Sequence, residues 1–252
     1  MSITLARVAT EFLKRPAIGP ATLRSYESTL MPFLKEYGRW PIDLISKQIL
    51  ESYIDRLSSL SVRTRHRHRS ILQALFNFAV EQDYLSSNPL PRIQQPSTEQ
   101  KALVRSFSPV QMVTLYRLVA SDLRMHALVC LLHRSGASVT EILAVDLMDV
   151  DRVNHRFEVA GRGNKRRLCF YSPDASVVLE RYITLERYSD CSALFTAQQY
   201  FSKQVSRLSY RTVHKNWTDL IKSEPTLKGM RIYDLHNTFL KEQMEIMKDE
   251  DI

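Results

Sequence analysis

The chain has 252 residues, of which 44% are hydrophobic and 25% are charged, and its formal net charge is +8. These values are ordinary for a soluble globular protein, and the length allows one large domain or two modest ones. No apolar run is long enough to cross a bilayer and no signal peptide is recognisable, so neither a membrane-spanning nor a secreted class is expected. The three cysteines, Cys130, Cys169 and Cys191, are expected to be buried thiols in a reducing compartment.

The excess of positive charge is divided equally between residues 1–100 and residues 101–252. Such a division is expected for two modules that contact one polyanion from two sides. A net charge of this size also occurs in basic proteins that are merely soluble. Local clustering of the cations therefore has to decide between the two interpretations.

Residues 1–90 have the apolar spacing of several helices, one of which is expected to be capped by Thr22 and to end near Gly38. A longer helix is expected after Ser61. Its first two turns are basic and contain no acidic residue, and the arginines are Arg63, Arg65, Arg67 and Arg69. This cluster is either a DNA-contacting surface or a solvated helix face. The histidines His66 and His68 are two residues apart and point to different sides of a helix, so no metal site is expected.

Residues 88–105 are rich in proline, serine, threonine and glutamine, which disfavours regular structure. We therefore divide the chain into a helical domain at residues 1–93, a linker at 94–106 and a second domain at 107–252. Ser108 and Gln111 have the spacing of a capping box, with a proline at the first helical position, so the second domain is expected to open with a helix.

Between His133 and Tyr171 the sequence predicts a helix start and then a β-hairpin. Ser138 and Glu141 have the spacing of another capping box. The apolar residues that alternate with polar neighbours, and are expected to pack, are Phe157, Val159, Leu168 and Phe170. The turn between them contains glycines and four cations, namely Arg162, Lys165, Arg166 and Arg167. A basic, glycine-containing turn is suited to phosphate contacts, and a solvated loop is the alternative.

A later helix is expected to open over residues 208–213. Four further cations, Arg207, Arg211, His214 and Lys215, are expected to crowd its first turns. Cations at a helix start suit contacts with a nucleic-acid backbone.

The order of these features resembles the tyrosine recombinases of the phage integrase and Xer group. The helix motif of that family reads T-G-hydrophobic-Arg-hydrophobic-S-E-hydrophobic-L, and this chain has Ser135-Gly136-Ala137-Ser138-Val139-Thr140-Glu141-Ile142-Leu143. The basic hairpin and the N-terminal helical pattern are also similar to the family. The resemblance covers nearly the whole chain and implies a mainly α fold of the α+β class. It would consist of a helical core-binding (SAM-like) DNA-binding domain and a recombinase-like catalytic domain with a small antiparallel sheet.

The resemblance implies a site that works without metal or cofactor. In that family a tyrosine attacks a DNA phosphate held by two arginines and a histidine, and a hairpin lysine protonates the leaving oxygen. Lys165 corresponds to this lysine and is the only catalytic position retained. Ser138 replaces the first arginine, Tyr233 replaces the histidine of the second family motif, and His236 replaces its arginine. The nucleophilic tyrosine is expected beyond Ile252, so the second domain is expected to be degenerate and truncated.

Loss of both arginines removes the donors that cleavage of a phosphodiester requires. We therefore expect a DNA-binding recombinase-like pseudoenzyme that is cytoplasmic, associated with the nucleoid, and free of metal or cofactor. Its expected partners are duplex DNA and either an active recombinase or a second copy of itself, and it would regulate or organise DNA or a recombination event. Two alternatives stay open: a split or truncated enzyme for site-specific recombination or integration whose missing residues are supplied elsewhere, and a protein-interaction module without DNA binding.

Overall fold

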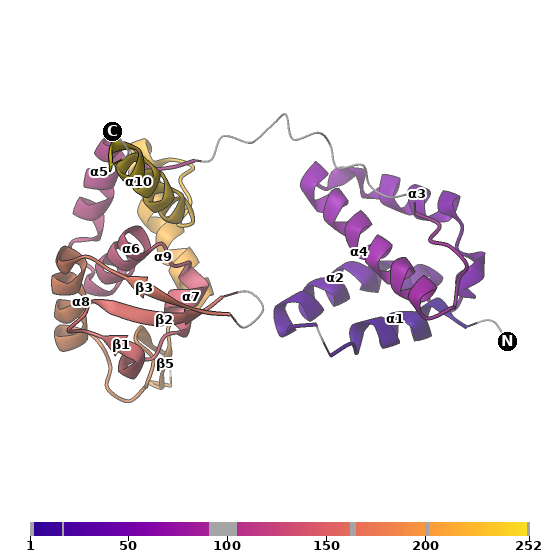
Figure 1. Cartoon of the computed structure of the whole chain (residues 1–252), viewed down its shortest axis with the longest axis horizontal. Coiled ribbons are helices and arrows are strands. Elements are labelled where there is room, and N and C mark those ends of the chain that lie inside the picture. The colour runs from indigo at the N-terminus through magenta and orange to yellow at the C-terminus, as the bar shows by residue number, and fades with distance from the viewer. Residues whose placement is uncertain (1–2, 17, 91–104, 162–164, 200–201, 251–252) are drawn as a thin grey trace. The chain divides into compact units, whose positions relative to one another are not determined.

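A computed structural model describes residues 3–16, 18–90, 105–161, 165–199 and 202–250. The chain divides into two compact units, Met1–Gln100 and Lys101–Ile252 (Figure 1). Among the helices described, none has the length and apolar character needed to cross a membrane.

The first unit is helical. Its helices are α1 (Leu5–Leu13), α2 (Pro20–Tyr37), α3 (Lys47–Arg56) and α4 (Val62–Glu81), with short 3-10 turns at Ile42–Leu44 and Leu57–Ser59. The apolar spacing read from the sequence produces one core, in which Phe12, Phe33 and Phe76 are completely buried. Rings from α1, α2 and α4 therefore pack against one another.

The helix starts of this unit were predicted with mixed success. Ser61 caps α4, because its hydroxyl accepts a hydrogen bond from the Thr64 amide at 3.2 Å. The single long helix expected after Ser61 is confirmed. The expected cap at Thr22 is wrong, because α2 already begins at Pro20 with Gly19 as its N-cap. Proline at the first helical position presets the backbone for a helix, which places Thr22 inside the first turn.

The second unit combines helices with two small antiparallel sheets. Its helices are α5 (Pro109–Val119), α6 (Leu123–Ser135), α7 (Val139–Ala144), α8 (Pro173–Leu185), α9 (Tyr210–Lys222) and α10 (Asp234–Glu250), with 3-10 turns at Leu147–Asp149 and Pro225–Leu227. One sheet has the order β1 (Val150–Asp151), β2 (Arg156–Ala160) and β3 (Arg166–Phe170), and the other pairs β4 (Thr196–Gln198) with β5 (Val205–Arg207). The predicted fold class is thereby confirmed.

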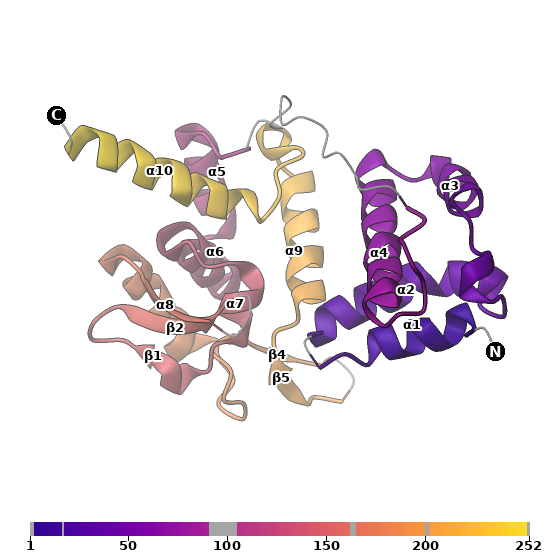
Figure 2. The same cartoon turned by 45° about the vertical axis from the view of Figure 1, so that its right-hand side comes forward.

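Helix α6 is the centre of the second unit. It packs against α8 and α10 and also contacts α5 and α7 (Figure 2). It contacts strand β3 as well. All of its residues from Ala127 to His133 are buried. The two predicted capping boxes start the helices on either side of it, at Ser108 for α5 and at Ser138 for α7. Helix α6 thus fixes where α7, α10 and the β2–β3 hairpin meet.

The inward face of the hairpin differs from the sequence prediction. Pairing of Ala160 with Arg166 places Cys169 opposite the buried Phe157, and the expected core residues Leu168 and Phe170 are 46% and 59% exposed. The prediction was wrong because register decides which alternate residues of a strand face the core, and a shift of one residue exchanges the two faces. Cys169 takes the buried place that Leu168 and Phe170 were expected to fill.

The cysteines largely agree with the expectation. Cys130 and Cys169 are buried, Cys191 is partly buried, and all three are free thiols. Burial raises the pKa of the Cys130 thiol to about 12, so this side chain behaves as a small apolar group.

Candidate functional site

Several sequence-predicted site residues line one cavity of about 790 Å³ in the second unit. Its walls come from the start of α7, the base of the β2–β3 hairpin, the first residue of α9 and the start of α10. Three positions that the sequence resemblance predicts to be altered catalytic positions, Ser138, Tyr233 and His236, line this cavity together with Arg167 of the hairpin. Residues almost one hundred positions apart in the sequence are thus brought to one site.

The hydroxyl and the amide of Ser138 both form hydrogen bonds at the start of α7. Its hydroxyl accepts a hydrogen bond from the Glu141 amide at 3.3 Å, and its own amide donates to the Glu141 carboxylate at 2.7 Å. These reciprocal bonds satisfy two donors that the first turn of α7 would otherwise leave open. Ser138, which was predicted to replace the first arginine of the recombinase motif, therefore serves as a helix cap.

Arg167 faces the cavity but is bound to the protein. Its Nη2 atom is 3.0 Å from a carboxylate oxygen of Glu141 and 3.5 Å from the carbonyl oxygen of Gly136. Burial alone would raise the pKa of Glu141, but hydrogen bonds from Ser138 and the nearby Arg167 charge outweigh it, so the pKa of Glu141 is lowered. Glu141 is therefore ionised and balances the guanidinium.

His236 is fixed by the turn that follows α6. Its Nδ1 atom is 2.7 Å from the carbonyl oxygen of Gly136. Gly136 has a left-handed backbone (φ 63°), and the ring of Phe239 occupies the space that a side chain at this position would need. Only glycine meets both conditions. This close approach of α10 to the end of α6 sets the position of the His236 ring.

The neighbours of His236 have different roles. Tyr233 is 57% exposed at the rim of the cavity, with its ring centre 5.5 Å from that of His236. Asn237 instead donates to the carbonyl oxygen of Arg105 at 2.9 Å. Asn237 thus ties α10 to the residues preceding α5 and has a structural role.

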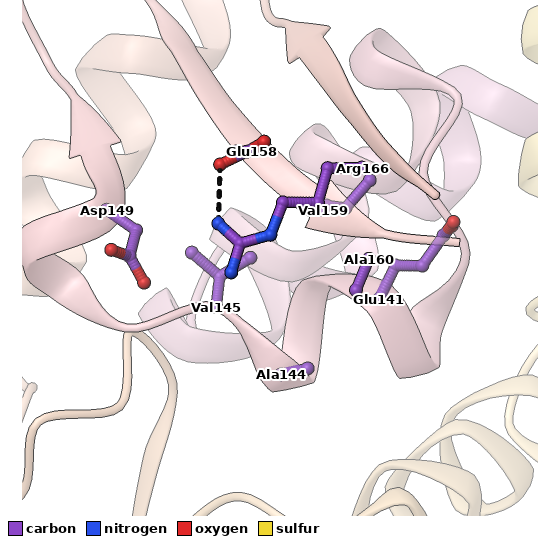
Figure 3. A pocket seen from close by; sticks show the side chains of 8 residues that line it. All are labelled: Glu141, Ala144, Val145, Asp149, Glu158, Val159, Ala160 and Arg166. Atoms are coloured by element: carbon purple, nitrogen blue, oxygen red, sulfur yellow. Dashed lines mark hydrogen bonds and ion pairs between the residues drawn. The ribbon is translucent and has the colours of Figure 1, made fainter. Parts of the chain in front are cut away.

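The hairpin cations are placed differently from one another. Lys165 is exposed where the turn closes, and its carbonyl oxygen accepts from the Gly161 amide at 2.8 Å. Arg162 lies outside the described residues. Arg166 and Arg167 belong to strand β3 and not to the turn. Arg166 bends back to Glu158 at 3.0 Å beside a small cavity of about 230 Å³ (Figure 3).

The cations around α9 also separate into two kinds. Arg207 ends strand β5, so it is not in the first turns of α9 as expected. Its Nη1 atom donates to the carbonyl oxygens of Leu143 and Val145 at 2.8 and 3.0 Å, and its Nη2 pairs with Asp146. The other three predicted cations of this group lie on α9 and are exposed, namely Arg211, His214 and Lys215. None of them has a carboxylate partner in the described chain.

In the first unit the predicted arginines lie along the first half of α4. Arg63 and Arg67 are exposed, Arg65 and Arg69 are partly buried, and Arg67 donates to the hydroxyl of Ser25. Within the residues that the structure describes, none of the four forms an ion pair with a carboxylate. The same residues contain no cluster of side chains that could hold a metal ion, which includes the surroundings of His66 and His68.

Sequence reasoning missed three contributors to the cavity. Tyr210 lines it from α9, Glu141 balances Arg167, and Gly136 holds His236. The capping box did identify Glu141, although only as a helix-start residue. The contacts of Tyr210 and Gly136 depend on chain segments far away in the sequence, so no local pattern indicated them.

Comparison with known proteins finds one matching domain family and several similar sequences. Residues 5–98 match the phage integrase SAM-like domain. The tyrosine recombinase XerC of Shewanella amazonensis is 24% identical over 239 residues, covering 92% of this chain and 79% of the relative. XerD of Rickettsia conorii is 23% identical, covering 90% and 78%.

Solved structures agree in fold. The Tn1549 transposon integrase in complex with a circular intermediate DNA has a TM-score of 0.73 at 16% identity, covering 97% of this chain and 88% of that chain. The lambda integrase tetramer bound to a Holliday junction has a TM-score of 0.71 at 14% identity, covering 95% and 73%. The match of residues 5–98 to the phage integrase SAM-like domain, the XerC and XerD relatives along the chain and this shared fold together support a member of the tyrosine recombinase family.

Proposed function

We propose that this protein binds duplex DNA as a recombinase-like factor and does not cleave it, so that it regulates or organises DNA or a recombination event. The observation that carries the proposal is the composition of the cavity. Ser138 and His236 stand where the family motifs have arginines, and the guanidinium of Arg167 is bound to Glu141. In the described wall of the cavity, no guanidinium is left for a phosphate.

Binding of DNA is supported by the exposed cations outside the cavity. The arginines of α4 and the start of α9 present positive charge that no described carboxylate neutralises. Such cations bind a phosphate backbone by releasing its condensed counterions. The relatives are named as tyrosine recombinases, and the similar integrase structures contain DNA, which is consistent with a DNA ligand here.

Absence of cleavage follows from the electrostatics of the reaction. Charge builds on the phosphate oxygens in the transition state, and donors that are already oriented stabilise it. Removal of one such donor typically costs about 10²–10³ in rate. Two departures, at Ser138 and His236, would together remove useful turnover even when their effects are not additive.

The test combines binding with covalent trapping. The protein is titrated on a labelled duplex at several salt concentrations, and it is also incubated with nicked duplexes that trap a covalent intermediate on denaturing gels. We expect salt-dependent binding and no adduct, while an active XerC relative run in parallel gives one. An adduct lost on Tyr210→Phe or Tyr233→Phe, the two tyrosines of the cavity wall, would overturn the proposal. A lack of binding, or affinity insensitive to salt, would favour a protein-interaction module.

A further inference from the structure

Strand β3 lies at the edge of its sheet. The strand order is β1-β2-β3, so among the described strands β3 has a partner on one side only. Two backbone hydrogen bonds define the pairing with β2. The Gly161 amide donates to the carbonyl oxygen of Lys165 at 2.8 Å, and the Tyr171 amide donates to that of His155 at 2.9 Å. Because hydrogen-bonded positions alternate along an antiparallel pair, every second residue between Lys165 and Tyr171 directs its backbone groups away from β2.

Three residues of β3 therefore present an amide and a carbonyl to the outer edge, namely Arg166, Leu168 and Phe170. None of these backbone groups has a hydrogen-bond partner within the described chain. An edge of this kind is a template for a further strand, and proteins commonly block it with a proline or a bulge. Strand β3 contains no proline and pairs with β2 in continuous register. Its outer edge is thus open to pairing.

The charges of β3 are balanced within the protein. Arg166 is 3.0 Å from a carboxylate oxygen of Glu158. Arg167 is likewise 3.0 Å from Glu141. Unpaired charges on an edge keep other strands away, but each of these cations has its own counter-ion. The remaining side chains of the edge are apolar and are 46% and 59% exposed. This edge therefore suits a protein strand better than a polyanion.

We propose that two copies of this chain pair through their β3 strands, antiparallel and about a two-fold axis beside Leu168, so that the two sheets join into one. Leu168 then lies opposite Leu168 of the second copy, and Arg166 lies opposite Phe170 of the second copy. Each opposed pair exchanges two backbone hydrogen bonds, so the outward amides and carbonyls of both edges are all satisfied. A guanidinium beside an aromatic ring adds a cation–π attraction.

The pattern of β3 selects this register and this partner. An axis beside Leu168 is the one two-fold arrangement that pairs every outward residue of β3 with an outward residue of the second copy. It also keeps the two Arg166 side chains at opposite ends of the interface, whereas like charges directly opposite each other are destabilising. The strand is thus complementary to itself, which favours a second copy over an unrelated strand. Because the paired segment is short, the expected dimer is weak and depends on concentration.

The experiment measures the molar mass of the full chain without DNA, by sedimentation equilibrium from about 10 to about 500 µM. We expect the mass of wild type to rise from that of a monomer toward twice that value. Leu168→Pro removes the central outward amide but no bond to β2, since proline is tolerated on an edge strand where the N–H faces solvent. Leu168→Lys opposes two cations at the axis. Both variants should remain monomeric.

Val177→Lys is the matched control. It makes the same change from an apolar residue to lysine at an exposed position of α8, and it should associate like wild type. Cross-linking tests the register in a Cys191→Ser background. Leu168→Cys should form a covalent dimer under mild oxidation at least about tenfold faster than Arg166→Cys, because the two copies of position 166 would lie about 14 Å apart along the strands.

The outcomes decide each part of the proposal. A chain that stays monomeric at the highest concentration leaves this edge to a strand of another protein and refutes the dimer. Association that persists in both Leu168→Pro and Leu168→Lys would place the interface elsewhere and also refute it. Faster cross-linking of Arg166→Cys than of Leu168→Cys would overturn the register. Circular dichroism checks that each variant is folded. None of these measurements involves DNA, so their failure leaves the proposed function untouched.

Discussion

The arginines of α4 and a group of arginines in the second unit give similar local charge, but they differ in whether they are paired with carboxylates. The arginines on the first half of α4 form no ion pair with a described carboxylate. In the second unit, Arg166, Arg167 and Arg207 are each bound to an acidic residue, namely Glu158, Glu141 and Asp146. A count of cations along the sequence treats these regions as equal. The structure separates the paired cations from the unpaired ones, and we expect the unpaired ones to contribute more to the binding of a polyanion.

The largest expected effect comes from comparing two double variants of the first unit, one without two unpaired arginines and one without two paired arginines. The double variant Arg63→Ala/Arg67→Ala removes two exposed cations of α4, and Arg7→Ala/Arg56→Ala removes two that are paired with Glu11 and Glu36. Both change the net charge equally. We expect the first to weaken DNA binding by roughly 10²-fold at low salt and to reduce the salt slope by about two, and the second to change neither substantially.

The measurement is a titration of one duplex at four salt concentrations for both double variants. Equal losses would show that net charge, and not the pairing of individual arginines, determines the affinity. Circular dichroism spectra of the two variants exclude unfolding as the cause of a loss.

A second prediction concerns the structural use of a paired cation. Arg207→Ala leaves the carbonyl oxygen of Leu143 without its guanidinium donor, and an unsatisfied buried polar group costs about 1–3 kcal/mol. We expect a lower free energy of unfolding by this amount in urea titrations. Arg166→Ala is the control, since its pair with Glu158 is exposed on both sides and contributes little. Equal stability of both variants would contradict the structural role of Arg207.

These contrasts also indicate what the sequence could reveal. The caps at Ser108 and Ser138 were predictable because a cap and its partner amide are three residues apart. Arg207 pairs with Asp146, which is 61 residues away, and His236 contacts Gly136, which is 100 residues away. No local sequence pattern could therefore predict either contact. The buried face of strand β3 was mispredicted because its phase depends on where the pairing begins after the turn.

A third prediction concerns the pH dependence of folding stability, which we attribute to the buried His133 of the second unit. His133 is 3% exposed, with Nδ1 2.7 Å from the Tyr116 hydroxyl and Nε2 3.0 Å from Glu242. Burial lowers the pKa of His133, and the hydrogen bond to Glu242 opposes this shift without overcoming it. The unfolded chain therefore binds the proton more readily than the folded one. Stability should fall as the pH decreases below about 6.5, by at most about 1.4 kcal/mol per pH unit.

Urea titrations at pH 5, 6, 7 and 8 measure this slope. His133→Gln keeps a donor for Glu242 and removes the titration, so its stability should depend less on pH than that of wild type. His214→Gln, at an exposed position, should keep the wild-type slope. The burial argument fails if His133→Gln retains that slope.

The smallest expected effect belongs to Lys165, which differs from the paired arginines beside it in strand β3. Its side chain is exposed and forms no ion pair within the described residues, so it should behave like an arginine of α4 and not like Arg166 beside it. Lys165→Ala should weaken DNA binding by a few-fold, or about 1 kcal/mol, and Lys165→Arg should retain most of the affinity, because a phosphate accepts either cation.

The hairpin should remain folded in both Lys165 variants, since Phe157, Val159 and Cys169 provide its buried contacts. Titrations at two salt concentrations, with circular dichroism as a folding check, measure the effect, and Arg166→Ala is the neighbouring paired control. If Lys165 were instead an acid in a cleavage step, its loss would abolish turnover and leave affinity nearly unchanged. Equal affinity of wild type and Lys165→Ala at low salt would therefore remove this turn from the DNA interface. The distinction between free and paired cations would then hold for α4 but not for the hairpin.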